Sequence, residues 1–251
     1  MQTLEEKIVD TQKIRNKTLV SFLCFFLFIA SCILAWKWLR SQPEDNGTPK
    51  PLRAVLNTNE KIFMGLFANN HLAKSFPVKD AVPRVRVNGD AGMSNNFDAS
   101  KWKLQLVKNP GDTVYISIDE IKALPKTEII FDFKCIEGWS QVTHWAGVKF
   151  TDFIKKYGLD QQSQMNFVGF NTPDKEYYVG IDMKSIVHPQ TLLCYEMNGQ
   201  PLPMNQGFPL RLIIPVKYGV KNIKRIGTIF FSNERPPDYW YERGYDYYGG
   251  L

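Results

Sequence analysis

The stretch that decides the fold is Ile129-Ile130-Phe131-Asp132-Phe133-Lys134-Cys135-Ile136-Glu137-Gly138-Trp139-Ser140. Hydrophobic residues recur at every second position up to Cys135, and this period predicts a β-strand. The thiol therefore shares a face with Phe131 and Phe133 and points toward the same interior. The residues after Cys135 predict a turn. A free cysteine at such a position is either a small core residue or a group placed for chemistry, and this stretch alone leaves both interpretations open.

The composition is that of a globular protein with room for one large domain or two small ones: 251 residues, 44% hydrophobic and 22% charged. The net charge of +6 comes from Lys and Arg residues that are spread along the chain among Asp and Glu. A nucleic-acid-binding protein usually concentrates its cations on one element, so the sequence argues against a nucleic-acid partner. The cysteines show neither a CxxC motif nor zinc-ligand spacing; they are Cys24, Cys32, Cys135 and Cys194.

Residues 18–38 form an apolar run with no charge before Lys37. About 20 apolar residues in a helix span the hydrocarbon core of a bilayer, so the run predicts a single transmembrane helix. Trp36, Trp38 and Arg40 form the aromatic and basic belt expected at a membrane interface. The alternative is a cleaved signal peptide, because Ile29-Ala30-Ser31-Cys32 resembles a lipidation site. We favour an uncleaved anchor, since the apolar run continues past Cys32.

Four segments follow from these patterns. Residues 1–17 form a polar tail, 18–38 the anchor, 39–79 a linker with a short amphipathic helix, and 80–251 a compact domain. The Pro-rich stretch 41–56 predicts a tether, and apolar residues at helical spacing predict a helix over 60–74 that packs on the domain or the membrane. The apolar residues are Ile62, Phe63, Leu66, Phe67 and Leu72. Basic residues flank the anchor on both sides, so the positive-inside rule does not choose its orientation.

The domain from residue 80 onward predicts an α+β fold. Short strands are expected near 102–106, 114–118, 129–135, 164–170, 177–181, 210–214 and 226–231. Short helices are expected at 119–124 and after Thr151, which is a suitable N-cap, with Gly158 as the C-cap. No regular βαβ alternation is present, which favours a mixed, barrel-like sheet over a doubly wound one.

Two polar features stand out in this domain. Arg211 lies inside Phe208-Pro209-Leu210-Arg211-Leu212-Ile213-Ile214-Pro215, where a buried guanidinium needs an anionic partner. That partner is either an internal carboxylate or a bound phosphate or heterocycle. The loop 218–225 carries three cations ahead of the next strand and predicts either a phosphate site or a solvated turn. Arg86 and Asn88 make a weaker case of the same kind, and Thr172 closes a strand as a turn or site residue.

An ordered series of motifs resembles a known family. The motifs are 133–140, His188-Pro189-Gln190-Thr191-Leu192, the run from Leu202 through Lys224, and Asn233-Glu234-Arg235-Pro236-Pro237. Together they resemble the sulfite-oxidase superfamily of molybdopterin-dependent oxidoreductases. Within it, they are most similar to the catalytic subunits of bacterial protein-methionine-sulfoxide reductases and their small relatives. The resemblance covers roughly residues 80–240 and implies the sulfite-oxidase-like molybdopterin-binding fold.

The resemblance implies a set of cofactor and site residues. Molybdenum would be bound by the Cys135 thiolate and by the dithiolene of one molybdopterin, an arrangement that suits soft sulfur ligands. Glu137, two residues past the metal ligand, would line the substrate pocket as a catalytic residue. The pterin and its phosphate would contact several residues; these are Arg86, Asn88, Thr172, Gln206, Arg211, Asn222, Ile223 and Lys224. Gln206 stands where the reductases have an asparagine.

The resemblance further implies oxygen-atom transfer. Sulfoxide reduction is favoured because Cys135-Ile136-Glu137-Gly138-Trp139-Ser140 is closer to the reductases than to the oxidases; sulfite oxidation is the alternative. A cofactor-free binding or assembly module with the same fold is a second alternative. We expect a membrane-anchored enzyme, a haem- or quinone-linked redox partner and a small-molecule or protein-bound sulfoxide substrate. We expect the soluble domain outside the cytoplasm, with the cytoplasm as the alternative because the chain has no twin-arginine signal.

Overall fold

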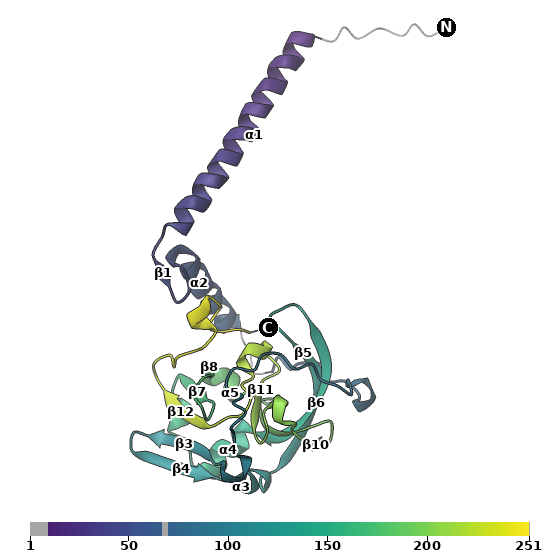
Figure 1. Ribbon diagram of the computed structural model, residues 1–251, viewed down its shortest axis with the longest axis vertical. Helices are drawn as coiled ribbons and strands as arrows, with labels where there is room; N and C mark the ends of the chain where they lie inside the picture. The colour runs from purple at the N-terminus through teal and green to yellow at the C-terminus, as the bar shows by residue number, and fades with distance from the viewer. Residues whose placement is uncertain (1–9, 67–69, 251) are drawn as a thin grey trace, which may run out of the picture. The chain divides into compact units, whose positions relative to one another are not determined.

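The computed structural model describes residues 10–66 and 70–250, and the chain divides into two compact units, Met1–Ala54 and Val55–Leu251 (Figure 1). The helices are α1 (Thr11–Arg40), α2 (Lys50–Leu66), α3 (Ile118–Lys122), α4 (Phe150–Tyr157) and α5 (Met183–Ile186).

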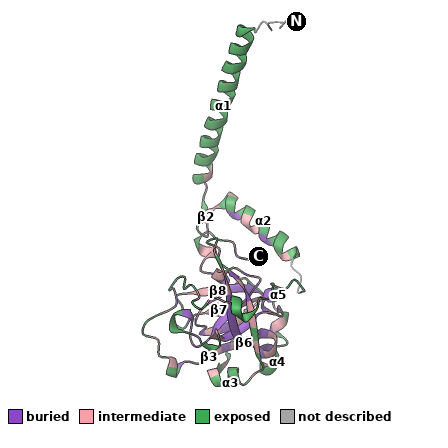
Figure 2. Cartoon of the chain, turned by 90° about the vertical axis from the view of Figure 1, so that its right-hand side faces the viewer, coloured by how far each residue is buried: buried purple, intermediate pink, exposed green. Residues whose placement is uncertain are grey.

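The first unit contains α1 and a short hairpin. Helix α1 is exposed along its length, as Figure 2 shows, and has a mean hydropathy that, with its length, would allow it to cross a membrane; a signal sequence would pass the same test. The predicted apolar helix is therefore confirmed, although it begins at Thr11 and includes part of the predicted polar tail, whose residues 1–9 lie outside the described residues. Strands β1 (Glu44–Asp45) and β2 (Thr48–Pro49) follow as an antiparallel hairpin.

Helix α2 begins at Lys50, ten residues before the predicted helix. The sequence interpretation was wrong here because it took Pro51 as a sign of a tether, whereas proline is compatible with the first turn of a helix. Arg53 is buried and its guanidinium donates to the backbone carbonyls of Asp45 and Asn46, so the hairpin caps the start of the helix. Phe67, which was predicted to lie on the helix, is outside the described residues.

The domain contains two five-stranded sheets. In the first, the order is β10-β9-β6-β5 with β11 paired to β9, and all pairs are antiparallel. These strands are β5 (Lys126–Lys134), β6 (Ser140–Lys149), β9 (Leu192–Met197), β10 (Gln200–Pro201) and β11 (Arg211–Ile213). Cys135 directly follows β5, and Arg211 begins β11, so this sheet carries two of the predicted site residues.

The second sheet has the order β4-β3-β12-β7-β8 and is mixed, because β12 pairs in parallel with β3 and antiparallel with β7. Its strands are β3 (Leu104–Asn109), β4 (Asp112–Ile116), β7 (Phe167–Asn171), β8 (Tyr178–Asp182) and β12 (Thr228–Ser232). The predicted α+β class and mixed sheet are confirmed. The barrel-like closure is not: the strands of the described residues form two open sheets.

One large hydrophobic core joins the two sheets and the short helices. It contains Leu106 of β3, Phe153 of α4, Phe170 of β7 and Leu212 of β11, each fully buried. Helix α4 ends at Tyr157 and is followed by Gly158, whose φ of +59° makes it the left-handed C-cap that the sequence predicted. The N-cap is Lys149 instead of Thr151. A smaller cluster, which includes Phe131, Phe133 and Trp145, lies under β5 and β6 and borders the site described below.

The C-terminal tail is fixed to the domain by a buried ion pair. The carboxylate of Asp238 accepts from the ammonium of Lys221 and from the backbone N–H of Gly180, and both charged side chains are 1% exposed. A second buried pair joins Lys217 to Asp182 over 2.8 Å. The tail therefore holds the loop that contains Lys221 against strand β8.

Replacing Asp238 by alanine leaves the Lys221 ammonium buried without its carboxylate. We expect a loss of about 3–5 kcal/mol in the free energy of unfolding, the usual cost of breaking a buried pair. Urea denaturation of wild type and variant measures it. The matched control is Asp119→Ala, at an exposed position of α3, which should change the free energy by less than about 0.5 kcal/mol. An equally stable Asp238 variant would contradict the structural role of the pair.

Candidate active site

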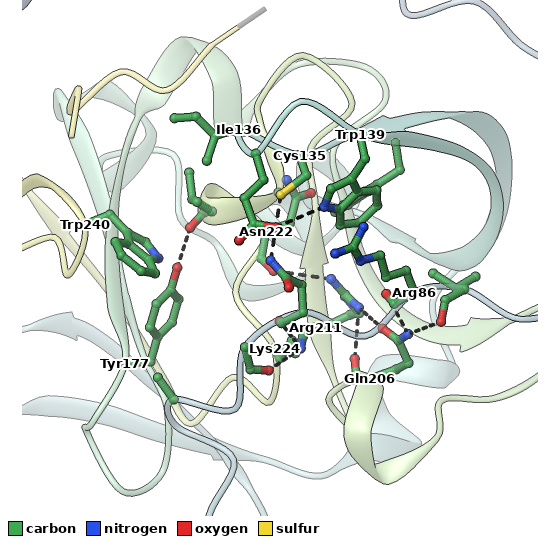
Figure 3. Close-up of a pocket in the computed structure, with 18 of the residues that line it drawn as sticks. Arg86, Cys135, Ile136, Trp139, Tyr177, Gln206, Arg211, Asn222, Lys224 and Trp240 are labelled. Carbon is green, nitrogen blue, oxygen red and sulfur yellow. Dashed lines mark hydrogen bonds between the residues drawn. The ribbon is translucent and has the colours of Figure 1, made fainter.

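One pocket lies where the end of β5, the start of β11 and the loop after β11 meet (Figure 3). The non-atom space in and above it is about 910 Å³, part of which is open solvent. Eight of the predicted site residues line it: Arg86, Asn88, Cys135, Glu137, Gln206, Arg211, Asn222 and Lys224. Residues more than 130 positions apart in the sequence therefore form one surface.

Cys135 is held at the pocket by the turn that the sequence predicted. The backbone N–H of Cys135 donates to the carbonyl of Trp139 over 2.9 Å, and Gly138 has a φ of +87°, which favours glycine. The thiol is 6% exposed, and the Asn88 amide nitrogen lies 3.9 Å from its sulfur. Both Cys135 and Cys194 are free thiols. The face shared with Phe131 and Phe133 thus directs one sulfur atom into the pocket.

Arg211 provides a buried positive charge at the pocket. It is 3% exposed, and its guanidinium lies 4.5 Å from the ring centroid of Trp145. Its Nη1 donates to the backbone carbonyl and side-chain carbonyl of Gln206, and its Nη2 donates to the carbonyl of Asn222, but its Nε has no hydrogen-bond partner. Burial lowers the pKa of Arg211 to about 10, so the group still carries its charge at neutral pH.

No carboxylate of the described residues forms an ion pair with Arg211. The internal salt bridge that the sequence left open is therefore not found in this part of the chain. The charged residues that line the pocket are Arg86, Arg211, Lys224 and Glu137. The excess of cations, together with the unpartnered Nε, indicates a site for an anionic or multiply accepting ligand.

The three cations of the loop 218–225 have different surroundings. Only Lys224 lines the pocket, where its ammonium donates to the carbonyls of Asn88 and Gly89 over 2.7 and 2.9 Å. Lys221 is paired with Asp238, and the Arg225 guanidinium donates to the Ser94 carbonyl. The structure therefore places one ammonium of the loop at the pocket, and phosphate binding by the loop stays a prediction.

Glu137 is exposed on the pocket wall beside Asn88 and Trp139. The hydrogen bond from the Asn88 side chain, followed by that from Trp139, lowers the pKa of Glu137, so it is ionised at neutral pH. The Arg86 guanidinium lies 4.8 Å from the ring centroid of Trp139. Asn88 is thus placed between the carboxylate of Glu137 and the sulfur of Cys135.

Aromatic residues that the motif analysis did not single out complete the pocket. Tyr177, Trp240 and Tyr245 line it, and the Tyr177 hydroxyl donates to the Val220 carbonyl over 2.6 Å. Figure 3 shows Tyr177 and Trp240 together on one side of the pocket. The available signal for Trp240 and Tyr245 was the density of aromatic residues in the C-terminal tail from Asp238 onward.

Two predicted residues do not line the pocket. Thr172 is buried in the turn between β7 and β8, where its Oγ1 lies 2.6 Å from Asp174 Oδ1 and accepts from the Tyr177 N–H. Ile223 is a fully buried core residue whose carbonyl accepts from the Leu212 N–H. Contact of these two residues with a cofactor stays a prediction.

A thiol, an unpaired guanidinium and an ammonium around one pocket suit an anionic cofactor with a soft metal. The family model described as "Oxidoreductase molybdopterin binding domain" matches residues 91–240. The chain belongs to this family. It is thus a molybdopterin-binding oxidoreductase, as the resemblance implied.

Curated relatives of this molybdopterin-binding oxidoreductase carry reductase names. A protein of Azospira oryzae with the provisional name protein-methionine-sulfoxide reductase subunit YedZ1 is 35% identical over 210 residues, which are 82% of this chain and 79% of the relative. The protein-methionine-sulfoxide reductase catalytic subunit MsrP of Campylobacter jejuni is 32% identical over 59% of this chain and 54% of its own. The chain thus spans about half the length of that subunit. A sulfane dehydrogenase structure, SoxCD from Paracoccus pantotrophus, aligns with a TM-score of 0.49 and 13% identity over 56% of this chain and 40% of its own.

The residues of the pocket fit a molybdenum cofactor. The unpartnered Nε of Arg211 and the positive charge of Lys224 suit its phosphate and polar pterin, and the Cys135 sulfur suits its metal. The described residues contain no group of three or more His, Cys, Asp and Glu that could hold a metal ion by themselves. Cys135, Arg211, Asn222 and Lys224 are therefore the residues that would hold the group.

The pKa of Lys224 predicts how anion binding depends on pH. Burial, followed by the charge of Arg211, lowers this pKa to about 8, below the value of an unfolded lysine. As pH rises, the folded chain therefore loses this proton at a lower pH than the unfolded chain does. The free energy of unfolding of the cofactor-free chain thus increases between pH values of about 8 and about 10. Inorganic phosphate should bind up to about tenfold more weakly for each pH unit above 8.

Calorimetric titration of the cofactor-free chain with phosphate between pH 7 and 9.5 measures this dependence. In Lys224→Arg the guanidinium stays protonated over this range, so the fall above pH 8 should disappear. The same slope in wild type and variant would show that another group controls binding.

Proposed function

We propose that this chain is a membrane-anchored molybdopterin-dependent reductase that converts sulfoxides to thioethers by oxygen-atom transfer. The observation that carries the proposal is the common pocket of the Cys135 thiol and the Arg211 guanidinium, which has no carboxylate partner among the described residues. The reductase names of the relatives favour sulfoxide reduction over sulfite oxidation.

The residues of the chain bind the cofactor and orient the substrate. The oxygen-atom transfer is the chemistry that the molybdenum cofactor supplies when bound. Arg211 and Lys224 neutralise the anionic part of the cofactor, and Cys135 provides the protein ligand of the metal. Tyr177, Trp240 and Trp139 surround the space beside Cys135 with aromatic rings, which pack against the apolar groups of a thioether or sulfoxide. Reduction of a sulfoxide consumes two electrons and two protons and releases water.

Glu137 is ionised, so it acts as a hydrogen-bond acceptor that orients the Asn88 amide beside the sulfur of Cys135. Replacing Glu137 by glutamine removes the charge but keeps the shape of the side chain. We expect kcat to fall by about tenfold, since a hydrogen bond to a charged group is worth about 1.5–3 kcal/mol. The molybdenum content should not change, because the proposed protein ligand of the metal is Cys135 and not Glu137.

Steady-state kinetics and metal analysis of the same preparation check this expectation. Glu176→Gln is the control, because Glu176 is exposed outside the pocket and should leave kcat unchanged. An unchanged kcat in the Glu137 variant would remove Glu137 from the site, and a loss of molybdenum would assign it to cofactor binding instead.

The proposal includes the surroundings of the enzyme. Helix α1 would anchor the chain in a membrane, with the soluble domain on the extracytoplasmic side, and a haem- or quinone-linked partner would deliver electrons. The length and composition of α1 support the anchor, and the word "subunit" in the names of the relatives supports a partner.

Activity assays of the purified full chain test the reaction. We expect reduction of methionine sulfoxide by a reduced viologen dye, and little oxidation of sulfite with an artificial acceptor. Activity with sulfite alone would reverse the proposed direction. A chain that is active with neither, and that keeps its visible spectrum unchanged in Arg211→Met, would be a cofactor-free module.

A further inference from the structure

Helix α2 presents an apolar stripe to solvent. The stripe consists of Val55, Ile62, Phe63 and Leu66, which are 56%, 53%, 54% and 73% exposed. Their spacing of seven, eight and eleven residues from Val55 places them on one face of the helix. A surface helix of a soluble domain normally turns such a face toward the core, so the arrangement of α2 is the reverse of the usual one.

The opposite side of α2 is polar and buried. Glu60 is 1% exposed, and its Oε1 accepts from the Arg235 guanidinium over 2.6 Å. Arg235 in turn lies 4.9 Å from the ring centroid of Tyr247 in the C-terminal tail. A rotation of α2 that buried the stripe would break this ion pair and move Glu60 away from Arg235. The Glu60 to Arg235 contact therefore keeps the stripe facing outward.

The start of α2 lies close to the end of α1 along the chain. The hairpin places Pro49 opposite Glu44, and the backbone N–H of Lys50 donates to the carbonyl of Pro43 over 3.0 Å. The nine residues between the two helices are thus folded back on themselves, and α2 begins beside Pro43, which is only three residues beyond the end of α1 at Arg40.

The end of α1 carries the residues that mark a membrane interface. Trp36, Lys37, Trp38 and Arg40 lie in its last turns, and the Arg40 guanidinium is 5.9 Å from the ring centroid of Trp36. If this end of α1 is at the lipid headgroups, the hairpin brings the first turn of α2 to the same level. An amphipathic helix at that depth buries its apolar face at the boundary of headgroups and acyl chains.

We propose that the apolar stripe of α2 inserts into the bilayer interface and forms a second, peripheral membrane contact of the catalytic domain. The inference rests on the proposed anchoring by α1 and adds a surface that the anchor alone does not require. A lipid surface is the occupant because only the nine residues 41–49 separate α2 along the chain from α1, the proposed membrane anchor. The contact would limit the orientations of the domain and so determine which of its faces a membrane-bound redox partner can reach.

Site-specific photocrosslinking in the full chain tests the contact. The photoreactive residue p-benzoylphenylalanine replaces Phe63 in one variant and Tyr115 in the control. Tyr115 is a matched aromatic residue on β4, 61% exposed and distant from α2 within the same unit (Figure 1). Both chains are expressed with radiolabelled phospholipid, irradiated in intact membranes and analysed for lipid and protein adducts.

We expect about tenfold more lipid adduct at position 63 than at position 115, because only an interfacial residue meets acyl chains. Equal lipid adducts at the two positions, or protein adducts that dominate at position 63, would overturn the inference while leaving the anchor intact. Extraction of the chain with alkaline carbonate separates the two proposals. A chain that is released by carbonate lacks the anchor, and both proposals then fail.

Discussion

Replacing Cys135 by alanine should give a folded chain that holds no molybdenum and reduces no sulfoxide. The thiol is the group that reaches the pocket from the end of β5, and no cluster of other metal-ligating side chains exists among the described residues to replace it. The side chain is small and belongs to neither core cluster, so its truncation costs about 1 kcal/mol of stability or less. The loss should therefore be chemical and not structural.

The second buried cysteine provides the control. Cys194 is fully buried on β9, its thiol donates to the Glu196 carbonyl, and burial raises its pKa to about 12, so it is an inert thiol. Cys194→Ala should keep its molybdenum and its activity. Metal analysis, pterin fluorescence and turnover of both variants make the comparison. Undiminished molybdenum in Cys135→Ala would show that the metal is bound elsewhere.

Replacing Arg211 by methionine should abolish cofactor binding with little loss of stability in the cofactor-free chain. Removing a buried arginine that has a carboxylate partner lowers the free energy of unfolding by about 3–5 kcal/mol, because the carboxylate is left unpaired. No described carboxylate is paired with Arg211, and its donors go to the Gln206 and Asn222 carbonyls. We therefore expect the cofactor-free variant to lose less than about 2 kcal/mol.

Pterin content per chain measures the first effect, and urea denaturation of cofactor-free protein measures the second. The pterin content should fall at least about tenfold, as expected when a bidentate donor to an anion is lost. Arg84→Met is the control, since Arg84 is exposed and does not line the pocket. A cofactor-free variant that is destabilised by about 3–5 kcal/mol would assign Arg211 a structural role instead.

The sequence predicted the parts of the site that depend on local patterns. The period of two placed Cys135 on the face of Phe131 and Phe133. The apolar surroundings of Arg211 required an anionic partner for it, either an internal carboxylate or a bound ligand. Both inferences rest on neighbours in the sequence, and both residues line the pocket.

The sequence could not predict the central strands of the first sheet. Strand β6 is buried on both faces from Thr143 to Val148, so its residues do not alternate between apolar and polar. Gly147 also interrupts the pattern, because a Cβ there would lie 2.1 Å from the carbonyl oxygen of Leu193 on β9. The reason for this glycine is a contact with a strand about 45 residues away in the sequence, which no local pattern shows.

The sequence also could not predict the side-chain directions in the loop 218–225. Lys221 and Lys224 are the same residue type in the same loop, yet Lys221 is paired with Asp238 and Lys224 faces the pocket. The difference depends on the C-terminal tail, which returns to the loop and supplies the carboxylate. The aromatic wall of Tyr177 and Trp240 depends on the same return of the tail.

We expect this chain to hold a molybdenum cofactor in the pocket of Cys135 and Arg211. Metal and pterin analysis of the full chain, purified from a host that synthesises molybdopterin, tests it most directly. Molybdenum and pterin are expected in equimolar amounts with the chain. A folded chain that contains neither would contradict it.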